Sequence, residues 1–342
     1  MAITLDTPQP QGRHLPALRR SGLVLILAAL VMAPLYLQNY YLHALIIAMI
    51  FLLPAHGLNL ILGYTGMLSL AQGAFFGIGA YVAGLLAIHL GSPFWFNIVA
   101  AGALTALIAL PLGIPALRLR TVSFVMCTLG LVVIAQTVAK NWISLTKGDM
   151  GLSGVPRPSF GWGAAATHIS SIPGYYYLVL AVVILATLGF VALIRSPAGR
   201  CMIAIRDNET LAEAFGVPTW RYKLIVFMLS AMFAGMGGAL YAQYMTVVSP
   251  LMFQMYYSNT ILIIVLGGGV GRVSGVLLGS FVFVALSEAL RITPELRMII
   301  YGAILLALVF CFPQGLARLV EQGMEKLAAL KGAGKEALTH ER

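Results

Sequence analysis

Long apolar stretches separated by short polar loops run through most of the chain. A helix needs about 20 apolar residues to cross a bilayer, so each stretch near that length predicts a membrane-spanning helix. The segment 258–271 is short and ends in three glycines. It is therefore either a span or a broken, re-entrant segment, so the chain has either ten or nine spans. The ten candidates are roughly 21–38, 41–62, 68–90, 94–113, 122–142, 175–195, 222–246, 258–271, 274–292 and 296–312.

The composition supports an all-α polytopic membrane protein. Of 342 residues, 60% are hydrophobic and 9% are charged, whereas a soluble domain carries about 25% charged residues. No Asp or Glu occurs between Asp6 and Asp149. A carboxylate at the bilayer centre costs about 3 kcal/mol, so this long gap fits several spans in series. An ordinary soluble enzyme, a disordered chain and a collagen-like fibre are excluded.

The basic residues predict the orientation of the spans. If the N-terminus lies in the cytoplasm and the spans alternate, sixteen Lys and Arg residues fall inside and five outside. This bias favours both termini inside. It predicts a cytoplasmic tail over 1–20, a transmembrane domain over 21–312 and a second cytoplasmic tail over 313–342. The net charge of +10 then arises from basic loop residues that orient the spans in the membrane. We therefore do not expect nucleic-acid binding.

Two predicted loops are long. Residues 143–174 fall outside and are rich in Gly, Ser and Pro, so they form either an ordered cap or a flexible loop. Residues 196–220 fall inside and predict two short helices. Ser196 can cap the first, and Asp207 or Asn208 can cap the second. Gly216 stands where a left-handed helix end is expected.

The second of these short helices is amphipathic. Leu211, Ala214 and Phe215 share an apolar side, while Glu209 and Glu213 lie elsewhere. Such a helix either floats at the membrane interface or docks in a groove of a partner.

Glycines interrupt the apolar pattern at two places. Residues 63–84 combine glycines with polar residues, which is typical either of close helix packing or of a broken helix that lines a path. A second interruption contains Gly267, Gly268, Gly269 and Gly271. Paired interruptions indicate an inverted repeat that relates spans 2–5 to spans 7–10. The candidate path residues are Asn59, Tyr64, Thr65, Ser69, Gln72 and Gly77.

No pattern for catalysis or metal binding emerges. The three cysteines show no metal-ligand spacing, and no Walker A, HExxH or GxSxG motif occurs. We therefore expect no catalytic residue, no metal site and no nucleotide site in this chain.

Two long motifs carry a resemblance to a known family. Together with the PQGL ending over 313–316, they resemble the permease subunits of branched-chain amino acid ABC importers, the LivM type. The resemblance runs from about residue 40 to residue 320. The motifs read GLNLILGYTGMLSLAQGAFFGIGAY over 57–81 and RCMIAIRDNETLAEAFGV over 200–217, followed by FMLSAMFAGMGGALY over 227–241.

The resemblance implies a type II ABC importer-like permease whose cytoplasmic loop docks into a groove of an ATPase subunit. ATP-driven closure of the ATPases would then move the spans. The coupling residues implied in this sequence are Arg200, Arg206, Asp207, Asn208, Glu209, Leu211, Glu213, Ala214, Phe215 and Gly216.

The resemblance also implies partners and a substrate class. We expect a homologous LivH-type permease, two ATPases that use ATP and Mg²⁺, and an extracytoplasmic solute-binding protein, all at a bacterial inner membrane. The chain itself would bind no cofactor. The substrate would be a branched-chain amino acid or a related small polar solute, moved by alternating access. The alternative is an ion-coupled secondary transporter, which would need intramembrane carboxylates that this sequence scarcely has.

Overall fold

The computed structural model describes residues 30–160, 167–168, 171–289 and 302–303. The chain divides into two units. One consists of residues 1–37 and 318–342, of which 30–37 are described and 30–36 are helical. The other is Gln38–Ala317 and holds every element discussed below. The predicted tails 1–20 and 313–342, and the predicted span 296–312 apart from 302–303, lie outside the described residues.

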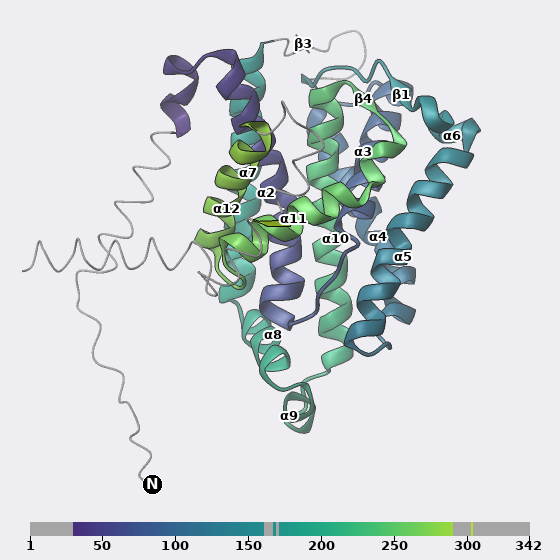
Figure 1. The fold of residues 1–342 in the computed structure, drawn as a ribbon, viewed down its shortest axis with the longest axis vertical. Coiled ribbons are helices and arrows are strands. Elements are labelled where there is room, and N and C mark those ends of the chain that lie inside the picture. The colour runs from purple at the N-terminus through teal and green to yellow at the C-terminus, as the bar shows by residue number, and fades with distance from the viewer. Residues whose placement is uncertain (1–29, 161–166, 169–170, 290–301, 304–342) are drawn as a thin grey trace, which may run out of the picture. The chain divides into compact units, whose positions relative to one another are not determined.

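Apolar helices dominate the second unit (Figure 1). Among the described residues, six helices are long and apolar enough to cross a membrane, and two shorter apolar helices, α11 and α12, follow them. The chain is therefore an all-α, multi-pass membrane protein, while the total of ten spans stays a prediction. The eight helices are α2 (Asn39–Thr65), α3 (Gln72–Leu90), α4 (Phe94–Ala116), α5 (Thr121–Asn141), α7 (Ile172–Arg195), α10 (Thr219–Met245), α11 (Met255–Gly268) and α12 (Val273–Ala289).

Short elements gather at the two ends of the helical bundle. Figure 1 shows α8 (Pro197–Asp207) and α9 (Glu209–Ala214) at the lower end, opposite β1 and β4. Antiparallel pairs form between β1 and β4 and between β2 and β3. The remaining short elements are α6 (Ile143–Thr146), η1 (Gly148–Met150), β1 (Leu152–Ser153), β2 (Ser159–Phe160), β3 (Thr167–His168), β4 (Val247–Val248) and η3 (Pro250–Phe253).

Helix α10 packs along α2, α3 and α4. Glycines allow the closest of these approaches. A Cβ added to Gly79 of α3 would overlap the backbone of Gly235, and one added to Gly238 would overlap the carbonyl of Phe76. The α3–α10 pair thus uses small residues to bring two backbones together, as membrane helices commonly do. This contact fits the close helix packing that is one of the two predicted roles of the glycine-rich segment 63–84.

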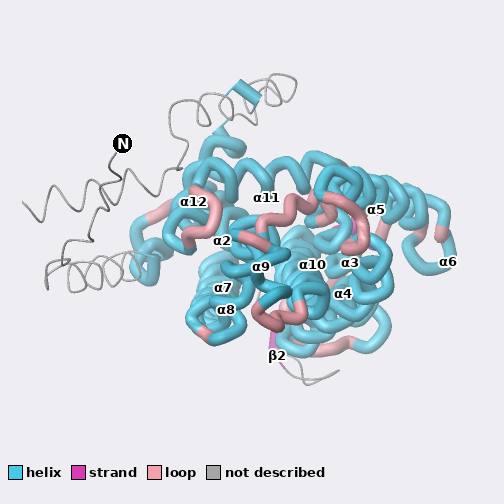
Figure 2. The backbone as a smooth tube through the Cα atoms, turned by 90° about the horizontal axis from the view of Figure 1, so that it is seen from below, coloured by secondary structure: helices cyan, strands magenta, loops and turns pink. Residues whose placement is uncertain are grey.

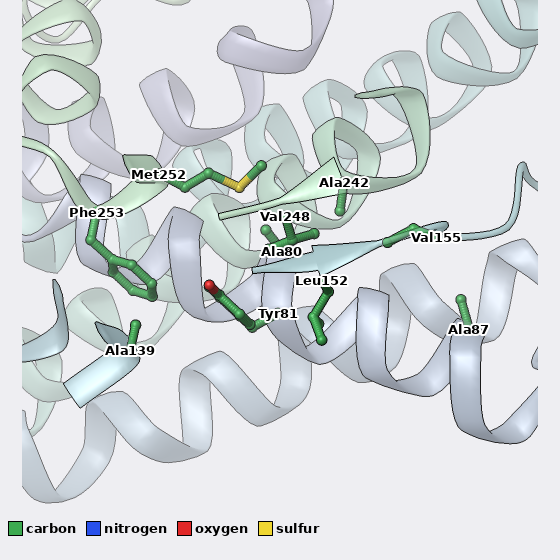
Figure 3. Packing of buried hydrophobic residues seen from close by; sticks show 10 residues of the cluster. All are labelled: Ala80, Tyr81, Ala87, Ala139, Leu152, Val155, Ala242, Val248, Met252 and Phe253. Carbon is green, nitrogen blue, oxygen red and sulfur yellow. The ribbon is translucent and has the colours of Figure 1, made fainter. Parts of the chain in front are cut away.

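The described part of the predicted outer loop is an ordered cap. Leu152 pairs with Val248, which joins the loop to the segment that follows α10. Leu152 and Val155 are buried with Tyr81 and Phe253 in an apolar cluster (Figure 3). The buried apolar side chains hold this part of the loop onto α3 and α10.

Each predicted interruption is a real break between helices. Helix α2 ends at Thr65, the following Gly66 has a φ of +74° in the left-handed region, and residues 66–71 contain no helix. Helix α3 consequently begins at Gln72 rather than at the predicted residue 68. Helix α11 ends at Gly268, and Gly269 and Gly271 take φ values of 125° and 77° before α12 begins.

Candidate functional site

The α8–α9 loop is built largely as its sequence predicts. Ser196 precedes α8 and Pro197 occupies its first turn. The Ser196 hydroxyl, however, donates to the carbonyl of Leu193 at 2.6 Å and makes no capping bond to α8, so its predicted capping role is wrong. The Ser196 amide also donates to the Leu193 carbonyl, so Ser196 closes the end of α7 instead of capping α8.

Helix α9 is capped at both ends. The Asn208 side chain accepts a hydrogen bond from the Leu211 amide at 3.0 Å. At the other end Gly216 adopts a φ of +81°, and its amide donates to the Glu213 carbonyl while the Val217 amide donates to Ala212. This paired arrangement is the Schellman motif, which requires a left-handed residue at that position. Both predicted caps of α9 are confirmed.

The acidic side chains of α9 fold back onto the start of α10. Glu209 forms an ion pair with Lys223, and Glu213 accepts a hydrogen bond from the Thr219 hydroxyl. Both carboxylates therefore fix α9 against its own chain. Both residues nevertheless remain exposed to solvent.

Helix α9 lies at one end of the bundle (Figure 1 and Figure 2), and most of its apolar residues are exposed. Leu211 is 54% exposed and Phe215 is 80% exposed, and Ala214 between them is also exposed. Trp220, at the start of α10, adds a ring that is 42% exposed. We call Leu211, Ala214, Phe215 and Trp220 the α9 surface. Arg200, Arg206 and Asp207 of α8 are exposed as well, and 41% of the Arg206 side chain is accessible.

The predicted path residues lie inside the subunit. Asn59 and Gln72 are buried, and each bonds to another helix or turn: Asn59 Oδ1 accepts from the Gly271 amide at 2.8 Å, and Gln72 Nε2 donates to Ser230 Oγ at 2.6 Å. Within the described chain, Asn59 Nδ2 and Gln72 Oε1 have no hydrogen-bond partner. Both side chains therefore join elements of this chain, and each keeps one unused polar atom.

The other predicted path residues are also engaged. Tyr64 donates to the Gly271 carbonyl at 3.0 Å, and Thr65 donates to the Ile61 carbonyl of its own helix at 2.6 Å. The Ser69 hydroxyl accepts from the Ala71 amide at 3.3 Å. A Cβ added to Gly77 would lie 2.6 Å from the ring of Phe253, so Gly77 is a packing contact.

The family is decided by comparison with known proteins. The profile of the family described as branched-chain amino acid transport system / permease component matches residues 40–309. The chain belongs to this permease family. The match spans α2 to α12 and so includes the α8–α9 loop and both helix breaks. The chain is accordingly a non-catalytic transport subunit of a membrane system.

Named permeases of several transport systems are similar to this family member. The high-affinity branched-chain amino acid transport system permease protein LivM of Escherichia coli K12 is 31% identical over 306 residues, covering 84% of this chain and 72% of LivM. LivH of the same organism is 25% identical over 296 residues, covering 82% of this chain and 96% of LivH. The L-arabinose transport system permease protein AraH is 35% identical over 119 residues, covering 32% and 36%. No solved structure matches.

Sequence reasoning about this permease missed the partners of its loop residues. Lys223 and Thr219 bind the α9 carboxylates, and the Gly63 carbonyl accepts from Arg206. Trp220 was not predicted to join the exposed apolar surface. The one available signal was the position of Trp220 and Lys223 just beyond Pro218, where a new helix must begin.

Proposed function

We propose that this chain is one permease subunit of an ATP-driven importer for branched-chain amino acids. The observation that carries the proposal is the family match over residues 40–309. The chain would act by alternating access, together with a LivH-type permease, two ATPases and an extracytoplasmic binding protein. ATP and Mg²⁺ would be used by the ATPases. The membrane would be a bacterial inner membrane, with both termini in the cytoplasm.

The α9 surface supports the ATPase part of the proposal. Two caps and two polar contacts to α10 stabilise a helix of only six residues. An isolated helix of that length is not stable in water. The result is a rigid apolar projection in which Phe215 is the most exposed side chain. An exposed aromatic ring of this kind can insert into a groove on a partner. We infer that the docking contacts are mainly apolar and that Glu209 and Glu213 position α9.

The order of elements after α2 and after α10 supports an inverted repeat. Helices α2 and α10 each contain 27 residues, and a left-handed residue follows each of them, Gly66 and Thr246. A segment without α-helix and then a shorter α-helix, α3 or α11, follows in both cases. Helix α10 packs with α3 and α4, while α2 packs with α11 and α12. This correspondence favours spans 2–5 and 7–10 as the two repeats of a type II importer-like permease with ten spans.

Contacts at the bundle ends agree with the proposed orientation. The α8–α9 loop contacts Gly63 at the end of α2, and Asn59 in the same helix contacts Gly271 between α11 and α12. These three segments lie on one side if the spans alternate from a cytoplasmic N-terminus. The segments joined by β1 and β4 then share the other side. We infer that the binding protein approaches the β1–β4 side and the ATPases approach α9.

The proposed substrate path passes buried polar atoms of the subunit. Gln72 Oε1 is an unused acceptor, which suits the ammonium group of a zwitterion, whereas we assign Asn59 to its contact with Gly271. Gln72 lies within one subunit, so a path that includes it requires the helix breaks to open. Tyr64, Thr65, Ser69 and Gly77 would then stabilise the segments around the breaks through the hydrogen bonds and packing contacts described above.

Reconstitution in proteoliposomes tests the proposed function. The chain would be co-expressed with the second permease and the ATPases encoded beside it, and supplied with the binding protein. The measurements are ATP hydrolysis and uptake of radiolabelled leucine, with L-arabinose as a competing solute and ionophores to remove ion gradients. We expect leucine-loaded binding protein to stimulate both activities, and ionophores to have no effect.

Other outcomes would change the proposal in defined ways. Stimulation by a different loaded solute would keep the importer and replace the substrate. Uptake that ionophores abolish, without assembly with an ATPase, would establish an ion-coupled transporter instead.

A further inference from the structure

Arg206 joins three segments that are distant in sequence. It lies in the last turn of α8, and its Nη1 donates to the Gly63 carbonyl of α2 at 2.8 Å. Its aliphatic stem covers Gly66, since a Cβ placed on Gly66 would lie 3.2 Å from Arg206 Cγ. A Cβ placed on Gly271 would lie 3.5 Å from Nη1, so the guanidinium also approaches the turn between α11 and α12.

The chemistry at the end of α2 explains why a guanidinium is suited to this place. The last carbonyls of a helix have no intrahelical donor and carry the negative end of the helix dipole. The last turn of α2 contains no basic residue. Arg206 supplies both a donor and a positive charge from another element. Asp207 holds the guanidinium in orientation, because its Oδ1 accepts from Nε and Nη2 at 3.2 Å each.

The same end of α2 holds the α11–α12 turn. The Gly271 amide donates to Asn59 Oδ1 and the Gly271 carbonyl accepts from Tyr64. A side chain at Gly63 would lie 2.6 Å from the Gly271 amide nitrogen, so the two backbones touch. The α8–α9 loop, the break after α2 and the break after α11 therefore meet at one point, with Arg206 as the member that comes from the loop.

We propose that Arg206 is a positioning residue that transmits displacement of the α8–α9 loop to both helix breaks. It acts within the chain rather than as a docking contact with the ATPase. This inference rests on the proposed function for its transport consequence, but the mechanical connection itself is a property of this chain alone. When α8 moves, the hydrogen bond from the Arg206 guanidinium to Gly63 displaces the end of α2. The hydrogen bonds of Asn59 and Tyr64 to Gly271 then displace the α11–α12 turn.

The first test measures the connection without transport. Spin labels are placed at Ala204 of α8 and Val270 of the α11–α12 turn, both exposed, in the full chain in lipid nanodiscs. Cys127, Cys201 and Cys311 are first replaced by serine. We expect one narrow distance distribution for the otherwise unchanged chain and a broad one for Arg206→Met. Arg195→Met removes the same charge from an exposed position at the end of α7 and should leave the distribution narrow.

The second test measures coupling in the reconstituted importer. Arg206→Met should co-purify with the ATPases at unchanged stoichiometry and hydrolyse ATP, while leucine uptake per ATP falls by about tenfold, within the usual range of coupling between sites. Arg206→Lys should recover part of the coupling, because an ammonium can reach the Gly63 carbonyl but cannot hold Asp207 at the same time.

A disulfide provides a rescue that a purely structural role would not predict. A Cβ on Gly66 would lie 3.9 Å from Arg206 Cβ, within the about 3.5–4.5 Å that disulfides span. When reduced, the double variant Gly66→Cys/Arg206→Cys should behave like Gly66→Ser/Arg206→Ser, which carries the same strain at the left-handed Gly66 but cannot form the bond. When oxidised it should regain the narrow distance distribution and uptake per ATP.

The outcomes separate the two proposals. A narrow distribution in Arg206→Met would overturn the mechanical connection. A broad distribution with unchanged uptake per ATP would overturn its role in transmission, and loss of ATPase co-purification would make Arg206 a docking residue instead. If the unsubstituted importer takes up no leucine with ATP, the proposed function fails, while the spin-label distances still decide the connection.

Discussion

Gly238 of α10 lies directly against the backbone carbonyl of Phe76 in α3, leaving no space for a Cβ. Gly238→Ala should therefore force the two helices apart and lower the free energy of unfolding by about 2 kcal/mol, as overpacking of a dense interior does. The measurement is the temperature at which half of the purified chain loses its monodisperse peak in size-exclusion chromatography.

Gly189 of α7 provides the matched control. Within the described chain, no atom beyond the neighbouring backbone of α7 lies within 4 Å of a Cβ added there, and alanine is a better helix former than glycine. Gly189→Ala should match or slightly exceed the unsubstituted chain in stability. Equal stability of the two alanine variants would show that the α3–α10 contact is looser than the structure indicates.

The exposed ring of Phe215 should dominate ATPase binding by the α9 surface. Phe215→Asp should weaken association with the ATPases by about 2 kcal/mol, the scale of a central aromatic anchor. Co-purification of a tagged ATPase at graded concentrations measures the loss. Thr210→Asp adds the same charge at another exposed position of α9 and should leave binding within twofold. Equal losses in both variants would point to charge rather than to apolar docking.

The Asn208 cap should govern the local stability of α9. Asn208→Ala removes the acceptor for the Leu211 amide and should cost about 1 kcal/mol, or roughly fivefold faster amide exchange. Hydrogen exchange of residues 209–214 measures the effect. Asn208→Asp retains an acceptor and should exchange at nearly the original rate. If alanine left the exchange unchanged, the contacts to Thr219 and Lys223 would be sufficient to hold α9.

Asn59 should contribute to stability more than to substrate affinity. Asn59→Leu leaves the Gly271 amide without its acceptor, which should cost about 1–3 kcal/mol. The KM for leucine of the folded fraction should not change, because Asn59 is buried within the subunit. Asn141→Leu makes the same replacement at an exposed position and should be nearly neutral. A raised KM at unchanged stability would place Asn59 in the substrate path.

Local chemistry in the sequence accounts for the elements that were predicted well. The lengths of the apolar stretches predicted the long helices between residues 39 and 245. The predicted start of α3 was too early because residues 66–71 are mostly apolar although they are not helical. The ends of α8 and α9 were predictable from Pro197, Asn208 and Gly216, because each of these residue types favours a helix end through its own local backbone geometry or hydrogen bonding.

Contacts between distant residues could not be predicted in the same way. Arg206 and Gly63 are 143 residues apart, and no spacing rule relates them. The polar residues of α2 suggested a path because polar groups in a span need partners. The sequence does not say whether that partner is a solute or, as with Asn59 and Gly271, another turn of the same chain.

The pairing of β1 with β4 constrains how the protein is made. Leu152 pairs with Val248, so its partner strand is synthesised only after α7, α8, α9 and α10. Until then Leu152 and Val155 can contact α3 and α5, which are made earlier, but they lack the cover that Val248, Met252 and Phe253 provide. The cap therefore closes late in biogenesis, and a chain that stops before residue 247 should present this loop to proteases and chaperones that never reach it in the finished protein.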